Sequence, residues 1–309
     1  MLAYVNGEFV EDAHASVSVR DRGFMLGDAV FEVWRTYGGT PCEAMIEKNL
    51  ARLTRGLCYM ELDAEPIVAE VRATNDELLR RNAEQLAETG DVLVFTIVTR
   101  GFVDEIAGGP GSKPTIVMFH NPIPDRGGAQ AGDDLYGKGA RLVTSLMYRD
   151  PFGAVDPRIK TTSRFAYARA ERKMSRSGPR TWTLFCDNDG NQTEASGGNV
   201  FIVEDGTLMR PPRERVLGGI NMTTFLELAQ GLGIPVEERN LTLYDYLSAD
   251  EVILTTTSVG AVRVTELDGI ALKPKSDVYD RVLQAFFEHV GYDFVTPVRE
   301  RAGVLTPGA

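Results

Sequence analysis

The spacing of apolar residues in the first third of the chain predicts a sheet with helices. Two short apolar segments around Asn6-Gly7 predict a tight hairpin with a type I′ turn. Residues 29–37, AVFEVWRTY, are β-branched and aromatic, as in a strand. In such a strand Phe31, Val33 and Arg35 share one face. Beyond this strand the pattern predicts helices at 45–60 and 65–88, then buried strands at 91–101 and 113–122.

A second run of elements follows residue 138. It reads as a strand at 140–148, a helix after Lys160, a strand pair within 181–212, a helix at 221–233 and a strand at 250–258. The stretch between the two runs is rich in Pro, Gly and Asp, which is typical of a linker or surface loop. We therefore expect an α+β or mixed α/β protein with domains at 1–122 and 139–309 and a linker at 123–138.

Composition narrows the choice of partners and location. The formal charge of −11 opposes a nucleic-acid or anionic-membrane partner. Cys42, Cys58 and Cys186 are far apart, which suggests reduced thiols in a cytoplasmic protein. We expect no leader peptide and no membrane span. The three histidines are scattered, so we expect no metal site.

Lys160 is the first candidate for chemistry. Asp156-Pro157 favours an extended approach, and Ser163 is a suitable N-cap for the Ala-rich helix that follows. A lysine between a strand end and a helix acts as nucleophile and base if its surroundings lower its pKa. The other interpretation is an ordinary surface lysine in a loop.

Three further features could bind a flat, phosphorylated ligand. Glu194 precedes a run of small residues and could bind a protonated ring nitrogen, or it is an exposed turn residue. Gly218-Gly219 lead into a helix whose first N–H groups, at Ile220 and Asn221, favour an anion such as phosphate. Thr256 and Thr257 close an apolar strand and could add hydroxyl donors. Each of these features alone is common.

Taken together in this order, the features resemble the class IV aminotransferases. These are pyridoxal 5′-phosphate (PLP) enzymes that include branched-chain amino acid, D-amino acid and R-selective amine transaminases and aminodeoxychorismate lyase. The motifs that carry the resemblance are DRGFMLGDAVFEVWRTYGG, NLARL, IKTTSRF, TEASGGNVFIVEDGTLMRPP, LGGIN, ADEVILTTTS and VTELDG. The resemblance implies fold type IV, with a small N-terminal α/β domain and a larger C-terminal PLP-binding domain that holds a β-barrel-like sheet and helices.

The resemblance also assigns roles to residues. Lys160 would form the internal aldimine, Glu194 would bind the pyridine nitrogen, and Arg52 would bind the phosphate, with Asn49 where a histidine is usual. Further cofactor contacts would come from Leu217, Gly219, Ile220, Asn221, Thr256 and Thr257. Substrate contacts would come from Phe31, Val33, Arg35 and Ser258. A homodimer is implied, with the site near its interface.

The implied reaction is ping-pong amino transfer. An incoming amine displaces Lys160, whose freed amine moves a proton from the substrate carbon to C4′ of the cofactor. Hydrolysis releases a ketone or keto acid, and a 2-oxo acid such as pyruvate or 2-oxoglutarate then accepts the amino group.

The substrate class is less clear from the sequence. Phe165 stands where branched-chain members carry a tyrosine, whereas Arg35 matches that group. Asp104, Glu105 and Ala107 stand where D-amino acid members carry an Arg and a His. DRGF, DPRIK and TTTSVGAVRVTELDG are most similar to the R-selective amine group, although Arg263 replaces a proline that is common there.

We therefore favour an R-amine or D-amino acid transaminase with an apolar pocket. The alternatives are a branched-chain L-amino acid transaminase, aminodeoxychorismate lyase, or a catalytically silent PLP-binding homologue. Half-reaction spectra with different amines would distinguish the transaminases, and release of an aromatic product without an amino acceptor would identify the lyase.

Overall fold

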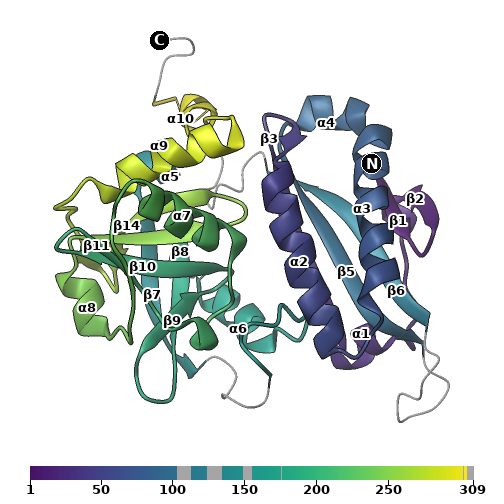
Figure 1. The fold of residues 1–309 in the computed structure, drawn as a ribbon, viewed down its shortest axis with the longest axis horizontal. Coiled ribbons are helices and arrows are strands. Elements are labelled where there is room, and N and C mark those ends of the chain that lie inside the picture. Colours follow the sequence, from purple (N-terminus) through teal and green to yellow (C-terminus); the bar gives the residue numbers. More distant parts are fainter. Residues whose placement is uncertain (103–112, 124–133, 149–154, 175, 302, 305–309) are drawn as a thin grey trace. The chain divides into compact units, whose positions relative to one another are not determined.

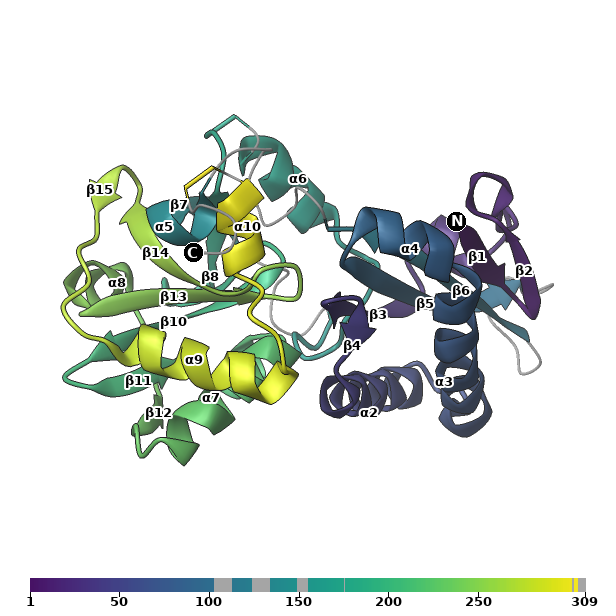
Figure 2. The same cartoon turned by 90° about the horizontal axis from the view of Figure 1, so that it is seen from above.

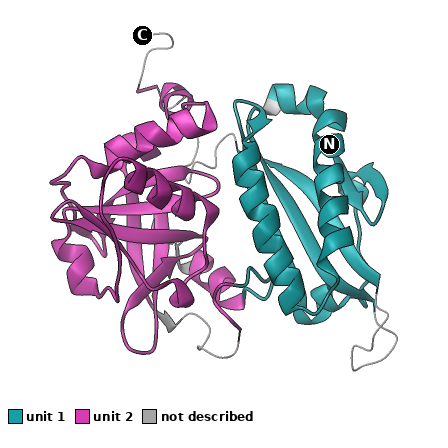
Figure 3. Cartoon of the chain, in the orientation of Figure 1, with its two compact units in different colours: residues 1–124, 159–164 teal, residues 125–158, 165–309 magenta. Residues whose placement is uncertain are grey.

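The fold is described from a computed structural model of the chain (Figure 1). It describes all residues except 103–112, 124–133, 149–154, 175, 302 and 305–309. The chain divides into two compact units (Figure 3). We call residues 1–124 with 159–164 the N-terminal unit, and residues 125–158 with 165–309 the C-terminal unit.

The N-terminal unit is a six-stranded sheet in the order β2-β1-β6-β5-β3-β4. Its strands are β1 (Leu2–Val5), β2 (Glu8–Glu11), β3 (Ala29–Tyr37), β4 (Thr40–Pro41), β5 (Val92–Phe102) and β6 (Lys113–Pro122). Its helices are α1 (Arg22–Leu26), α2 (Glu43–Tyr59), α3 (Ala64–Arg81) and α4 (Ala83–Thr89), with a 3₁₀ turn, η1 (Asp12–His14). All pairings in this sheet are antiparallel.

Helices α2 and α3 lie side by side on one face of this sheet (Figure 2). Val30 and Trp34 of β3 join the core beneath these helices, whereas Phe31 and Val33 join a separate apolar cluster. Successive residues of a strand point to opposite faces, so the two faces predicted for β3 are confirmed. Phe31 and Val33 therefore lie on the face of the sheet opposite α2 and α3.

Two local predictions in this unit have different outcomes. Asn6 and Gly7 have φ values of 51° and 97° between β1 and β2, as a type I′ turn requires, so the hairpin is confirmed. The single helix predicted at 65–88 is wrong, because α3 ends at Arg81 and α4 begins at Ala83. The intervening Asn82 bonds through its side chain to both backbone groups of Leu2, at 2.7 and 2.9 Å.

The C-terminal unit is built on a nine-stranded sheet. Its strands are β7 (Ala140–Tyr148), β8 (Thr181–Cys186), β9 (Gln192–Ala195), β10 (Gly198–Glu204), β11 (Thr207–Arg210), β12 (Val236–Glu238), β13 (Glu251–Thr256), β14 (Gly260–Leu267) and β15 (Ile270–Ala271). Its helices are α5 (Leu135–Lys138), α6 (Phe165–Met174), α7 (Ile220–Gly231), α8 (Leu243–Ser248), α9 (Val278–Val290) and α10 (Thr296–Arg301), with a 3₁₀ turn, η2 (Arg213–Arg215).

Six of these strands close into a barrel, because β9 pairs with both β8 and β10 at the two ends of the path β10-β13-β14-β7-β8. Leu184, Ala195, Val200 and Leu254 belong to one buried apolar cluster, which fills the barrel. Outside the barrel, Phe201 of β10 packs against Phe225 of α7, with ring centroids 5.4 Å apart. Figure 2 shows α7 beside α9.

The mixed α/β class and the barrel-like sheet are thus confirmed. The predicted linker falls largely on residues 124–133, outside the described residues, and its last four residues form α5. The predicted strand pair within 181–212 is four strands, β8 to β11. Among the described residues, no helix combines the length and apolarity that a bilayer crossing needs.

Candidate active site

The Lys160 segment is attached to strand β3. The backbone N–H of Phe31 donates to the Lys160 carbonyl oxygen at 2.9 Å, and the N–H of Thr162 donates to Ala29 at 3.1 Å. These bonds explain why residues 159–164 group with the N-terminal unit, whereas the sequence pattern predicts one domain for all of 139–309. The candidate lysine therefore depends on β3 for its backbone position.

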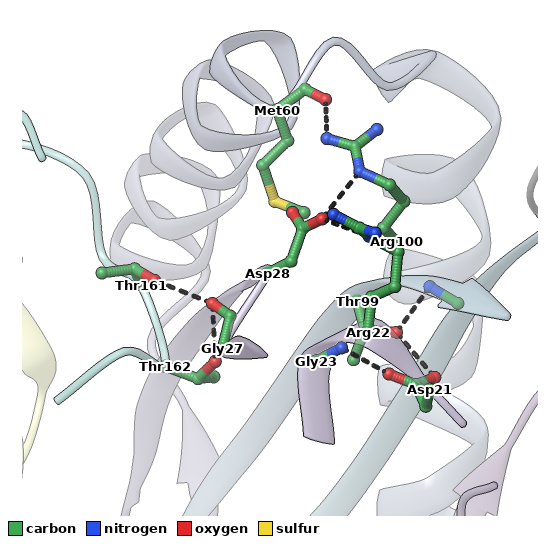
Figure 4. A network of polar contacts seen from close by, with 11 residues as sticks. Asp21, Arg22, Gly23, Gly27, Asp28, Met60, Thr99, Arg100, Thr161 and Thr162 are labelled. Carbon is green, nitrogen blue, oxygen red and sulfur yellow. Dashed lines mark hydrogen bonds and ion pairs between the residues drawn. The ribbon is translucent and has the colours of Figure 1, made fainter. Parts of the chain in front are cut away.

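The turn before β3 holds the other side of this segment (Figure 4). The hydroxyls of Thr161 and Thr162 both donate to the Gly27 carbonyl oxygen at 3.4 Å. Gly27 has a φ of 70°, and a Cβ there would lie 3.0 Å from Cβ of Ser163. Glycine is therefore required both by the left-handed backbone and by the close approach of the two segments.

An ion-pair network fixes that turn (Figure 4). Oδ2 of Asp28 accepts from Nε of Arg22 and Nε of Arg100, each at 2.9 Å. Arg100 also donates to the Met60 carbonyl oxygen at 2.6 Å, which ties the network to the end of α2. Burial alone would raise the pKa of Asp28, but the two arginines outweigh it and hold the pKa below its usual value. The carboxylate is thereby kept ionised under the Lys160 segment.

The amine of Lys160 lies on the face of the sheet opposite α2 and α3. Its Nζ is 4.5 Å from the centroid of the Phe31 ring. Phe31 and Phe95 pack there against the buried residues Val33, Leu93 and Ile123. The guanidinium carbon of Arg164 lies 5.5 Å from the same ring centroid, so the Phe31 ring contacts two cationic side chains, whereas its neighbours in the cluster are apolar. Phe31 and Val33, both predicted to contact substrate, are therefore near Lys160.

The two arginines predicted for this unit are in buried ion pairs. Arg35 donates to Asp91 at 3.1 Å and is 6% exposed. Arg52 makes a bidentate pair with Glu32, at 2.7 Å for both bonds, and is 7% exposed. Glu32 alternates with Phe31 along β3, so Arg52 lies on the helix-covered side of the strand. The structure does not bring Arg52 to the face that carries the Lys160 amine.

Glu194 lies at the closure of the barrel. It is on β9 opposite Asn199 of β10, and it is 3% exposed, so it is not an exposed turn residue. Its neighbour Ala195 points into the barrel, so Glu194 points outward. Its Oε2 accepts the backbone N–H of Leu217 at 2.8 Å, and its Oε1 accepts the hydroxyl of Tyr167. A buried carboxylate is thus held by two neutral donors.

The glycine turn after Leu217 leads directly into α7. The side chain of Asn199 donates to the Leu217 carbonyl oxygen at 2.8 Å, so Leu217 is held on both sides. Gly219 is the N-cap of α7 and, as a glycine, provides no side-chain hydrogen bond to the first turn. The N–H groups at Ile220 and Asn221 are therefore arranged as the sequence predicted, at a helix start that favours an anion.

The end of strand β13 joins the same group of residues. Nδ2 of Asn221 donates to the carbonyl oxygen of Thr256 at 2.6 Å. The hydroxyls of Thr256 and Ser258 lie 3.0 Å apart. Direct hydrogen bonds thus connect Leu217 to both Glu194 and Asn199, and a separate hydrogen bond connects Asn221 to Thr256, with Thr257 next in the chain. The C-terminal unit brings its predicted residues together.

Three residues qualify the sequence interpretation. Phe165, the position of the family's tyrosine, is 76% exposed, whereas Tyr167 is buried and bonds to Glu194. Tyr167 and Ala170 share a buried face of α6, and this three-residue spacing was the signal that could have identified Tyr167.

Arg263, unexpected from the resemblance, pairs with Glu251 and Asp280 at 3.0 and 2.9 Å and so connects the sheet to α9. Residues Asp104, Glu105 and Ala107 lie outside the described residues.

A surface groove in the C-terminal unit is separate from these residues. It has a volume of about 440 Å³ and is lined mainly by the outer side of α7, including Met222 and Leu226, and by β12. Of the residues proposed here for ligand binding, the groove includes Gly218 but neither Glu194 nor Asn221.

Among the described residues, no group of three or more His, Cys, Asp or Glu side chains is placed to hold a metal ion.

The chain is similar in sequence to enzymes with different substrates. The family model for amino-transferase class IV matches residues 29–267. A putative branched-chain-amino-acid aminotransferase of Methanocaldococcus jannaschii is 32% identical over 89% of this chain and 91% of its own length. A D-alanine aminotransferase of Bacillus licheniformis is 26% identical over 87% of this chain and 89% of its own.

The fold is likewise similar to that of solved structures. The 4-amino-4-deoxychorismate lyase of Pseudomonas aeruginosa superposes with a TM-score of 0.76 at 27% identity, covering 95% of this chain and all of the lyase chain. These similarities confirm the resemblance drawn from the motifs, and with it fold type IV. The extent of the family match and the 32% identity together show that the chain belongs to the class IV aminotransferases, enzymes that use pyridoxal 5′-phosphate.

Proposed function

We propose that this enzyme transfers the amino group of a primary amine or an amino acid with an apolar side chain to a 2-oxo acid, with R-amines or D-amino acids as donors. The observation that carries the proposal is the apolar cluster beside Lys160. Phe31 and Val33 belong to it, and the lysine amine lies 4.5 Å from the Phe31 ring. Such a face suits an apolar substituent on the substrate carbon.

The residues fit the cofactor in chemistry and placement within each unit. When bound, PLP supplies an aldehyde for amines and a protonated ring that withdraws electrons from the substrate carbon. The buried carboxylate of Glu194 would bind the ring nitrogen. The uncapped start of α7 at Ile220 and Asn221, with the hydroxyls of Thr256 and Thr257, would hold the phosphate.

Lys160 is the proposed nucleophile and proton carrier. Its amine would bind the cofactor aldehyde in the resting enzyme, and after an amine substrate displaces it, the same amine would take the proton from the substrate carbon. The backbone hydrogen bonds of this segment to Phe31 and Ala29 hold the Cα from which the lysine side chain extends. Arg52, which the resemblance names as a further phosphate contact, would have to leave its pair with Glu32 to reach the phosphate.

The state of Arg35 supports a donor without an obligatory carboxylate. Its guanidinium is neutralised by Asp91, which also accepts from Thr36 at 2.9 Å and from the N–H of Gly39. Opening that pair to bind a substrate carboxylate would leave the Asp91 charge without its cation. We therefore treat Arg35 as a wall of the pocket and not as a carboxylate trap.

A branched-chain L-amino acid transaminase is the second candidate, because a relative so described is 32% identical over most of the chain. The apolar cluster would suit leucine or valine equally well. Aminodeoxychorismate lyase is the third, because the similar Pseudomonas aeruginosa structure is a lyase. The lyase would release an aromatic product without needing any amino acceptor.

A homodimer is proposed as the working form. Val19, Phe24, Met25 and Leu26 are each more than half exposed, next to the turn that holds the Lys160 segment. A group of exposed apolar side chains of this kind is typical of an interaction surface. Light scattering should give twice the chain mass for the wild type and the mass of one chain for the double variant Phe24→Glu/Met25→Glu; a monomeric wild type would refute the dimer.

The unpaired cysteines Cys42, Cys58 and Cys186 support a reducing, cytoplasmic location.

A panel of half-reactions tests the substrate proposal. The PLP-loaded protein is mixed with R- and S-1-phenylethylamine, D-alanine or L-leucine, without an acceptor, and the visible band of the bound cofactor is followed. R-1-phenylethylamine or D-alanine should remove the band, and pyruvate should restore it. Loss of the band with L-leucine alone would establish the branched-chain alternative, and no loss with any amine would refute amino transfer from these donors.

A further inference from the structure

Both oxygens of the Glu194 carboxylate are held by groups of the protein. The hydroxyl of Tyr167, on α6, donates to Oε1, and the N–H of Leu217, before α7, donates to Oε2 at 2.8 Å. The carboxylate is 3% exposed, so these donors replace the water that would otherwise solvate it. A carboxylate that accepts two hydrogen bonds cannot rotate without breaking one of them.

The Tyr167 hydroxyl comes from a fixed ring. Tyr167 is 7% exposed and packs edge-on against Phe185, with ring centroids 5.2 Å apart and planes at 63°. Ala170 and Phe185 complete this buried cluster between α6 and β8. A packed tyrosine has two side-chain torsions to lose, so the hydroxyl is presented to the carboxylate at low entropic cost.

We propose that Tyr167 is a positioning residue that acts on the cofactor through Glu194. The two hydrogen bonds fix the orientation of the Glu194 carboxylate, and Tyr167 supplies the one to Oε1. A carboxylate held in this orientation would meet the ring nitrogen of PLP with the same geometry each time. Without the Tyr167 hydroxyl the carboxylate could rotate away, so the positive charge of a protonated ring nitrogen would be less well balanced. The inference rests on the proposed pairing of Glu194 with the ring nitrogen.

The hydrogen bond to Leu217 gives this arrangement a second consequence. Leu217 directly precedes Gly218-Gly219 and the start of α7, where the phosphate is proposed to bind. The carboxylate that would meet the ring nitrogen is thus bonded to the loop that would meet the phosphate. Loss of the Tyr167 contact should therefore weaken cofactor affinity as well as alter the ring nitrogen.

The test measures cofactor affinity and the state of the ring nitrogen, neither of which requires turnover. The dissociation constant of PLP is measured for wild type, Tyr167→Phe, Glu194→Ala and the double variant. Tyr167→Phe removes a hydrogen bond to a charged group, so it should raise the dissociation constant of PLP about tenfold. When Glu194 is already alanine, Tyr167→Phe should raise this constant less than about twofold, because the effects of two residues that act through one contact are not additive. Equal effects in both backgrounds would refute the inference.

The matched control is Tyr246→Phe. Tyr246 is also a fully buried tyrosine of the C-terminal unit, but its hydroxyl bonds to the Val200 carbonyl oxygen at 3.4 Å. This control should leave PLP affinity at the wild-type value. If Tyr246→Phe and Tyr167→Phe weaken binding equally, Tyr167 has only a structural role and the inference fails.

The ¹⁵N chemical shift of PLP labelled at the ring nitrogen gives the second readout. The shift should move toward that of a neutral pyridine in Tyr167→Phe and stay unchanged in Tyr246→Phe. If Tyr167→Phe does not fold, 3-fluorotyrosine at position 167 keeps the ring and makes the hydroxyl a stronger donor, and the shift should then move in the opposite direction. An unchanged shift would overturn the inference. Failure of the proposed function would appear separately, as wild-type protein that binds PLP but transfers no amino group.

Discussion

The N–H of Phe31 donates to the carbonyl oxygen of Lys160 at 2.9 Å, and the Phe31 ring lies 4.5 Å from the Lys160 amine. One residue of strand β3 therefore contacts both the backbone and the side chain of the candidate nucleophile. The backbone position of the lysine is set within the N-terminal unit, to which residues 159–164 belong. Changes in β3 or in the turn before it should therefore affect the position of the lysine.

Asp28→Asn should destabilise the turn beneath Lys160. The change removes the charge that Arg22 and Arg100 share, and a hydrogen bond to a charged group contributes about 2 kcal/mol. The thermal midpoint of the cofactor-free protein should fall by several degrees. The control is Asp12→Asn, an exposed residue of the same unit, which should leave the midpoint unchanged. Equal midpoints for Asp28→Asn and wild type would contradict a structural role for the network.

Glu194→Gln should slow catalysis more than it weakens substrate binding. A neutral amide cannot balance a protonated ring nitrogen, so kcat should fall about 10- to 100-fold, with KM for the amine nearly unchanged. Steady-state kinetics check this, with Glu204→Gln, an ion-paired surface residue of the same unit, as the control. If Glu194→Gln keeps the wild-type kcat, the ring nitrogen is held by another group.

Gly219→Ala should disrupt the loop before α7, whereas Gly218→Ala should not. A Cβ at Gly219 would lie 2.0 Å from Oδ1 of Asn199, but a Cβ at Gly218 would meet no atom within 4 Å. Displacing Asn199 breaks its bond to Leu217, and such overpacking costs about 1–3 kcal/mol. Differential scanning calorimetry of the cofactor-free proteins should show a lower midpoint for Gly219→Ala alone. The same midpoint for both variants would mean that Asn199 is not essential to the loop.

His120 should make the protein less stable in mild acid. Burial, and then the charge of the N-terminus, lower its pKa from 6.5 to about 4. The unfolded chain then binds a proton more readily than the folded one, so the stabilisation is complete above pH 6.5 and is lost as the pH falls toward 4. A shift of this size corresponds to about 3 kcal/mol at most.

Thermal unfolding at pH 7.5 and pH 5 checks this prediction. His120→Gln should flatten the decrease in midpoint between the two values, because the titrating group is gone. His289→Gln, which removes an exposed histidine, should keep the wild-type decrease. The same pH dependence in wild type and His120→Gln would show that other groups cause it.

Local patterns predicted the parts of the site that depend on short stretches of chain. The alternation along β3 placed Phe31 and Val33 on one face, and Gly218-Gly219 before an apolar helix marked the start of α7. Both features depend only on residues that are neighbours in the chain, so they can be predicted from one sequence without knowledge of the fold. The fold type and the cofactor followed from the resemblance and not from composition.

Contacts between distant segments were missed for a physical reason. The break between α3 and α4 occurs where Asn82 bonds to Leu2, and the grouping of residues 159–164 with β3 arises from pairing across more than 100 positions. Tyr167 was overlooked because only the fold brings α6 to β9. Helical spacing marks such a residue as buried, but it does not identify the carboxylate that the hydroxyl meets.

The central claim is that Lys160 carries the cofactor and gives it up during amino transfer. Borohydride reduction of PLP-loaded protein, followed by peptide mapping, tests it most directly, with Lys160→Ala and the exposed Lys273→Ala as variants. The reduced cofactor should be found on the peptide that contains Lys160 in wild type and Lys273→Ala, and not in Lys160→Ala. After prior incubation with excess R-1-phenylethylamine or D-alanine and no acceptor, the label should be lost. Label on another lysine, or label that persists at Lys160 after every amine in the panel, would contradict the account.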